Sequence, residues 1–132
     1  MSLSPLATAP RLAIAAFLSL AVAGSASAQP AAPSVTVIVR SFSFAPQPIH
    51  LRAGQPVTLT FVNQSGNGHD FTAASFFASS AITAGAAPGG MIELRGHETR
   101  SIALVPRAGV YPAHCSHFMH SMFGMHDTIV VN

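Results

Sequence analysis

Apolar residues recur at every second position over much of the chain. The pattern is clearest in residues 35–39 and 57–61, where valine, leucine and phenylalanine alternate with mostly polar side chains. A strand with one buried face has this period, because successive side chains point to opposite faces of a sheet. Shorter apolar segments predict further strands over residues 49–51, 92–94, 101–105, 110–113 and 128–131.

Turn-forming residues separate these segments. Pro46 and Pro48 interrupt the first alternating stretch, and Ala53-Gly54-Gln55 predicts a turn before the next one. Residues 73–90 are small, apolar and Gly-rich, and they show no clear period. No long segment keeps a helical period. Many short strands with turns between them predict an all-β sandwich or barrel, whose end loops would carry a site.

The first 28 residues have the pattern of an export signal. Arg11 supplies a positive charge, residues 12–24 are an apolar run, and Ala26-Ser27-Ala28 is a small-residue cleavage signal. The apolar run is shorter than the roughly 20 residues that span a bilayer, so no stable membrane insertion is expected after cleavage. We expect a periplasmic or secreted protein with a signal peptide over 1–28, a flexible leader over 29–34 and one domain over 35–132.

From residue 29 onward the chain carries little charge. It has no lysine, and five arginines against four acidic residues give a formal charge of +1 with histidine neutral. Binding to nucleic acid needs a clustered basic patch, so no nucleic-acid partner is expected. Cys115 is the only cysteine, and an exported chain therefore has no internal disulfide. A lone thiol in an oxidising compartment is the first indication of a metal.

Potential metal ligands are concentrated in residues 114–126. These thirteen residues include one thiol, four imidazoles and three thioethers. An apolar core segment with exposed histidines and a catalytic Cys/His pair are the alternatives, but thioethers would add nothing to acyl transfer. Soft thiolate and thioether beside imidazole form the ligand set that copper selects, so the segment predicts a copper site.

Strand alternation sorts the first candidates of this segment. If residues 110–115 form a strand with Ala113 pointing inward, Cys115 also points inward and His114 points outward. His117 follows Cys115 by two residues, which is too close to chelate the same ion comfortably. Cys115 is therefore a candidate ligand, His114 is not, and His117 would be one only if the loop folded back at once.

Spacing along the chain suggests the other ligands. His120 lies five residues after Cys115, which allows a turn between them. Met125 lies five residues further on, and Gly124 before it allows a second turn. The missing imidazole should come from an earlier loop, where His69 is the best-placed candidate. His50 and His97 are expected to be ordinary surface residues.

Several motifs resemble those of the cupredoxins, the type 1 blue copper proteins of the plastocyanin/azurin-like superfamily. They are Phe42-x-Phe44-x-Pro46, Ala53-Gly54-Gln55-Pro56-Val57, Asn63, Gly68-His69-Asp70-Phe71, Tyr111-Pro112-x-x-Cys115, and the spacing of Cys115, His120 and Gly124-Met125. The resemblance covers nearly all of the chain after the signal, and its specific part is the spacing around Cys115. It implies a Greek-key β-sandwich with one copper ion held by two histidines and a cysteine in a plane and by a weak axial methionine.

The resemblance implies a role for each candidate ligand. Cys115 would be the thiolate, His120 the exposed imidazole, Met125 the axial thioether and His69 the buried imidazole of the first ligand loop. Met122 is the alternative axial ligand, because some members of the family have a shorter ligand loop.

Asp70 stands where the family often has Asn or Ser. Two hypotheses follow for its carboxylate. Its charge could favour oxidised copper and lower the reduction potential, or its hydrogen bonds could tie the two ligand loops together.

A one-electron carrier is the function that such a site predicts. The alternative is a copper-handling protein, for delivery, storage or resistance, which a surplus of soft ligands would serve. That surplus consists of His114, His117, Met119, Met122 and His126.

Enzymatic activity is not expected. Multicopper oxidases flank the cysteine with a histidine on each side, whereas Ser116 follows Cys115 here and the sequence has no His-x-His pair. The expected partner is a redox protein that docks weakly and transiently on apolar residues near His120, and we expect a monomer.

Overall fold

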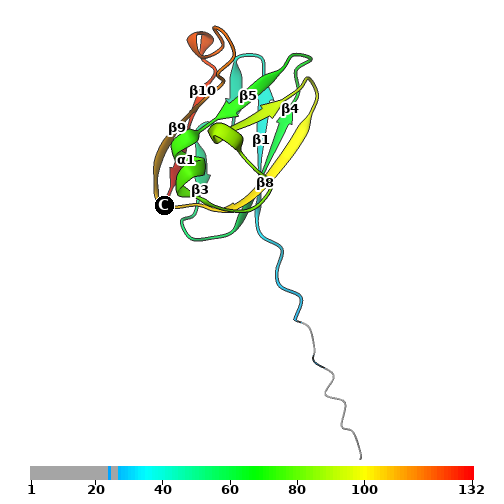
Figure 1. Cartoon of the computed structure of the whole chain (residues 1–132), viewed down its shortest axis with the longest axis vertical. Helices are drawn as coiled ribbons and strands as arrows, with labels where there is room; N and C mark the ends of the chain where they lie inside the picture. The colour runs from blue at the N-terminus through cyan, green and yellow to red at the C-terminus, as the bar shows by residue number, and fades with distance from the viewer. Residues whose placement is uncertain (1–23, 25–26) are drawn as a thin grey trace, which may run out of the picture.

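The computed structural model describes residue 24 and residues 27–132 (Figure 1). Most of the expected signal peptide over residues 1–28 lies outside the described residues, so its assignment stays a prediction. No helix in the described part of the chain is long and apolar enough to cross a membrane. Residues 27–33 have no regular secondary structure, and the first strand begins at Ser34.

Two five-stranded sheets make up the described domain. In sheet I the strands lie in the order β2-β1-β4-β8-β6, and they span Ser43–Ala45, Ser34–Arg40, Val57–Asn63, Thr99–Val105 and Ala81–Ala84. In sheet II the order is β3-β10-β9-β5-β7, and the strands span Ile49–Leu51, His126–Val131, Gly109–His114, His69–Thr72 and Met91–Leu94. The predicted all-β class is therefore confirmed.

The strand connections are those of a Greek-key sandwich. Strands β1 and β4 pair in parallel, as do β3 and β10, and the remaining pairs are antiparallel. Most neighbouring strands are not consecutive in the sequence, so the chain crosses repeatedly from one sheet to the other.

The core lies between the inner faces of the two sheets. Phe71 of sheet II packs against Phe44 and Phe61 of sheet I, with ring centroids 5.2 and 4.8 Å apart. All three rings are buried, at positions where strand alternation directs them inward. Burying a side chain of this size contributes about 1.5–3 kcal/mol to the stability of the fold. This cluster therefore helps to hold the two sheets together.

The segment without a clear period, residues 73–90, contains a short helix α1 (Ala74–Ser79), the edge strand β6 and a 3₁₀ turn η1 (Pro88–Gly90). The sequence did not predict helix α1, whose Phe76 and Phe77 are buried. A helix of six residues is too short to repeat a 3.6-residue period, and β6 is exposed at every position, so neither leaves an amphipathic pattern.

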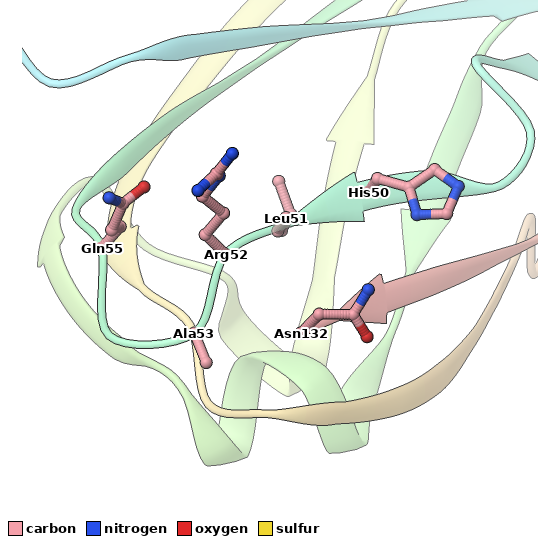
Figure 2. A pocket seen from close by; sticks show the side chains of 6 residues that line it. All are labelled: His50, Leu51, Arg52, Ala53, Gln55 and Asn132. Atoms are coloured by element: carbon pink, nitrogen blue, oxygen red, sulfur yellow. The ribbon is translucent and has the colours of Figure 1, made fainter.

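The C-terminal ligand segment lies at the end of the sandwich opposite the chain's C-terminus. In Figure 1 residues 115–125 form the orange-red loop at the top, and the C-terminus lies at the bottom of the domain. An open hollow near the C-terminus is lined by His50, Leu51, Arg52, Ala53, Gln55 and Asn132 (Figure 2). This hollow is therefore remote from the segment rich in potential ligands.

Candidate metal centre

Three of the four expected ligand residues converge at one end of the sandwich. Nδ1 of His120 lies 3.2 Å from Nδ1 of His69 and 3.3 Å from Sγ of Cys115. The donor atoms of all three side chains lie within 4.8 Å of one another. His69 begins β5, and Cys115 directly follows β9. His50 and His97 lie outside this cluster, as expected.

Met125 returns the chain to the side of Cys115. Its side chain is fully buried, and its backbone carbonyl accepts a hydrogen bond from the Cys115 N–H at 3.0 Å. Met122 lies in the short 3₁₀ turn η2 (Ser121–Phe123) and is 78% exposed. Burial therefore favours Met125 over Met122 as the thioether of the cluster.

The loop between Cys115 and Met125 closes on itself as the glycine position predicts. Gly124 has a φ of +91°, which is strained for residues with a Cβ. The Met125 N–H donates to the His120 carbonyl at 3.1 Å, and the His120 N–H donates to the His117 carbonyl at 3.1 Å. These bonds turn the loop twice, so residues ten positions apart lie side by side.

Asn63 fixes the loop that precedes His69. Its side chain is buried, and its Nδ2 donates to the carbonyls of Asn67 and Arg95 at 2.8 and 2.9 Å. Its Oδ1 accepts from the N–H and the hydroxyl of Ser65 at 3.0 and 2.9 Å. One amide thus satisfies four polar groups and holds the turn that leads into β5.

Asp70 joins the two ligand loops. Its carboxylate is buried and accepts hydrogen bonds from the backbone N–H of Ser116 at 2.9 Å, from the Ser116 hydroxyl, and from the Thr72 hydroxyl at 2.7 Å. Its own N–H donates to Sγ of Cys115 at 3.5 Å. This arrangement supports the hypothesis that Asp70 ties the loops together.

Burial sets the protonation of the two deepest donors. It lowers the pKa of His69 below 6.5, and the nearby imidazoles of His120 and His117 lower it further. The ring of His69 is therefore neutral at pH 7, with one nitrogen free to bind a cation. Burial also raises the pKa of the Cys115 thiol above 9.0, so a metal ion bound there would displace a proton.

The donor set fits copper. A thiol and two imidazoles converge, and a buried thioether side chain lies next to the cysteine along the paired backbone. The nearest buried carboxylate, Asp70, directs its oxygens to Ser116 and Thr72. Soft sulfur beside imidazole selects copper, whereas magnesium and calcium require oxygen ligands.

Exposed apolar residues precede and follow His120 in the ligand loop, and the ring of Phe42 contacts its half-buried ring. Phe42, in the loop between β1 and β2, approaches it edge-on with ring centroids 5.4 Å apart, and Phe42 also contacts Phe123 at 5.5 Å. We call the exposed set the apolar rim, and it comprises Phe42, Phe118, Met119, Met122 and Phe123. The exposure of these side chains agrees with the apolar surroundings predicted for His120, and docking there stays a prediction. Sequence reasoning missed Phe42, which the chain order separates from the ligand loop.

The remaining histidines of the segment lie outside the three-residue cluster, although the ring of His117 stacks beside that of His120 with centroids 5.5 Å apart. His114 is exposed on β9, which confirms the orientation predicted by strand alternation. Nε2 of His117 lies 3.0 Å from a carboxylate oxygen of Glu93 and 3.6 Å from one of Asp70. His126 is exposed on β10.

Comparison with known proteins identifies the family. The family model described as a cupredoxin-like domain matches residues 12–131, so the chain belongs to the cupredoxin-like family. The resemblance found in the sequence motifs is thus confirmed.

Two solved structures support the same fold. Auracyanin B shares 22% identity with this chain at a TM-score of 0.55, and the match covers 80% of this chain and 93% of auracyanin B. A dithionite-reduced auracyanin from the photosynthetic bacterium Roseiflexus castenholzii shares 16% identity at a TM-score of 0.57, over 77% of this chain and 98% of that one. No curated protein sequence matches the chain.

Proposed function

We propose that this protein is an exported one-electron carrier that binds one copper ion through His69, Cys115, His120 and Met125. The observation that carries the proposal is the convergence of a thiol and two imidazoles within 4.8 Å in a mostly buried position. Copper bound there would supply one-electron redox chemistry.

The surroundings of the proposed ligands suit rapid electron transfer. His69 begins a strand and Cys115 follows one, and Asp70 connects the two segments by hydrogen bonds. Ligands that the fold holds in place change their positions little when the bound ion gains or loses an electron. The half-buried ring of His120 reaches the surface within the apolar rim, which would give an electron a short route to a docked partner.

The proposed location is the periplasm or the extracellular space. Support comes from the signal pattern of residues 1–28 and from a single cysteine, which a metal would occupy in an oxidising compartment. We further propose a leader over residues 29–34 and a copper-binding domain over 35–132, which contains all ten strands but the first residue of β1 and the cluster of His69, Cys115 and His120.

Copper titration of the mature chain tests the proposal. We expect one copper ion in the cluster of His69, Cys115 and His120, with an intense visible charge-transfer band from the Cys115 thiolate to Cu(II). Cys115→Ser should abolish the band, whereas the control His114→Ala should leave it intact, because His114 faces solvent. Bleaching by His114→Ala, or a band that survives Cys115→Ser, would contradict the assignment.

A pair of methionine variants tests the axial ligand. Met125→Leu should change the visible spectrum and the reduction potential, because a buried thioether beside the cysteine is lost. Met122→Leu should change neither, because that side chain is largely in solvent. The reverse result would assign the axial role to Met122.

Copper handling is the second candidate function. The specific observation in its favour is that the thioether side chains of Met119 and Met122 are exposed in the apolar rim, where they could receive or release Cu(I). Competition with chelators discriminates between the two functions. A carrier should retain copper in both oxidation states, whereas a handler should release it readily in one.

A further inference from the structure

Two histidines lie opposite each other on neighbouring strands of sheet II. The register of β9 and β10 pairs His114 with His126. The next pair along the ladder is hydrogen-bonded, because the Cys115 N–H donates to the Met125 carbonyl at 3.0 Å. His114 and His126 are therefore a non-hydrogen-bonded pair, the kind whose side chains approach most closely, with Cβ atoms about 4.5–5.5 Å apart.

The two rings share the outer face of the sheet. Cys115 and Met125 are buried, so strand alternation directs the preceding His114 and the following His126 to the opposite face, where both are exposed. Within the described part of the chain, neither imidazole forms a hydrogen bond or an ion pair. Both side chains thus face water from opposite positions on two paired strands.

We propose that His114 and His126 form a second, solvent-exposed site for a divalent transition-metal ion of the Zn²⁺, Ni²⁺ or Cu²⁺ class. Imidazole is a preferred ligand for these ions, and water would complete the coordination. The strand pair keeps the two residues opposite each other, so the second imidazole binds as an intramolecular ligand and strengthens binding over that of a single histidine. This site lies on the opposite face of the strands from the proposed copper centre and does not depend on it.

A neighbouring cluster on the same sheet is less suited to bind a cation. Asp70, Glu93 and His117 bring their polar atoms within 4.8 Å of one another. However, the oxygens of Asp70 already accept hydrogen bonds from Ser116 and Thr72, and His117 is engaged by Glu93.

Titration with Zn²⁺, followed through the NMR signals of the individual imidazoles, tests the second site. In the wild-type protein the signals of His114 and His126 should move together along one binding curve. His126→Ala should weaken Zn²⁺ binding at His114 by at least about tenfold. Zn²⁺ that enters the cluster around Cys115 is reported separately by the signals of His69 and His120.

His50→Ala is the matched control. His50 is also exposed in sheet II, but its register partner is Val130, so it has no histidine opposite. This variant should leave Zn²⁺ binding at His114 unchanged. Different binding curves for His114 and His126, or an unchanged affinity at His114 in the His126→Ala protein, would overturn the proposal.

Discussion

Asp70 illustrates how a residue outside the proposed ligand set can organise a site. Its carboxylate accepts hydrogen bonds from Ser116 and Thr72, and its N–H donates to the Cys115 sulfur. Hydrogen bonds to a charged group contribute about 1.5–3 kcal/mol each. Asp70→Ala should therefore weaken copper binding by at least about tenfold, measured by chelator competition.

The Asp70→Asn variant separates the effect of these hydrogen bonds on copper binding from the effect of the negative charge. Asparagine keeps an acceptor for the Ser116 N–H, so copper affinity should fall less than in the alanine variant. If charge also contributes, the reduction potential should rise, because a carboxylate favours the oxidised ion. Equal losses of affinity in both variants would show that the retained acceptor does not hold the loops.

Single residues were predictable from the sequence where strand alternation decides their orientation. The two-residue period of a strand predicts that Cys115 points inward and that His114 points outward. Both orientations are confirmed. The partners of Asp70 and His117 were not predictable, because Ser116 and Glu93 lie 46 and 24 residues away in sequence. Only folding brings such pairs together.

Asn63 stabilises a whole loop through the hydrogen bonds of its side chain. Asn63→Ala would leave the carbonyls of Asn67 and Arg95 and the Ser65 N–H without this partner. A buried polar group left unpaired costs about 1–3 kcal/mol, so we expect a loss of stability of at least about 2 kcal/mol in urea unfolding. Asn63→Asp should destabilise at least as much, because it replaces the donor with a carboxylate oxygen that faces the carbonyls of Asn67 and Arg95 at a buried position.

The turn between β7 and β8 predicts a pH effect. Glu98 accepts hydrogen bonds from the Arg95 N–H at 2.7 Å and from Nε of Arg100 at 3.0 Å, and these lower the pKa of Glu98 below 4.5. A carboxyl whose pKa is lowered in the folded state stabilises the fold above its unfolded pKa. That stabilisation is lost as the pH falls through the folded pKa.

An NMR titration of the Glu98 carboxyl checks this effect. Arg100→Ala should raise the pKa of Glu98 toward 4.5 without restoring it fully, because the Arg95 N–H still donates. Arg107→Ala, which removes an arginine that makes no ion pair in the described structure, is the control. An unchanged pKa in the Arg100→Ala protein would rule out the contribution of the guanidinium.

Elements were predictable from the sequence where one face is buried and the other is not. Strands β1, β4 and β10 alternate and were expected close to their observed positions. Strand β5 was missed because His69, Asp70 and Phe71 are all buried, which removes the alternation. Its outer face is covered by the loop after Cys115, through contacts such as that between Asp70 and Ser116.

At the scale of the molecule, low charge and the apolar rim predict how the protein meets a partner. The chain from residue 29 has a formal charge of +1, and five apolar side chains are exposed around His120. Long-range steering needs charge, and salt screens it over about 10 Å at 0.1 M. Docking through the rim should therefore be weak, brief and nearly independent of salt.

Electron self-exchange between the Cu(I) and Cu(II) forms of this protein tests that prediction without a known partner. The rate, measured by NMR line broadening, should change by less than about threefold between low and physiological ionic strength, because two molecules that meet through their rims repel each other only weakly. Met122→Glu places a like charge in both rims, so its rate should be slow at low salt and rise as salt is added. Met122→Gln has the same shape without the charge and should behave like the wild type. A steep salt dependence in the wild type, or none in the Met122→Glu protein, would show that self-exchange does not proceed through the rim.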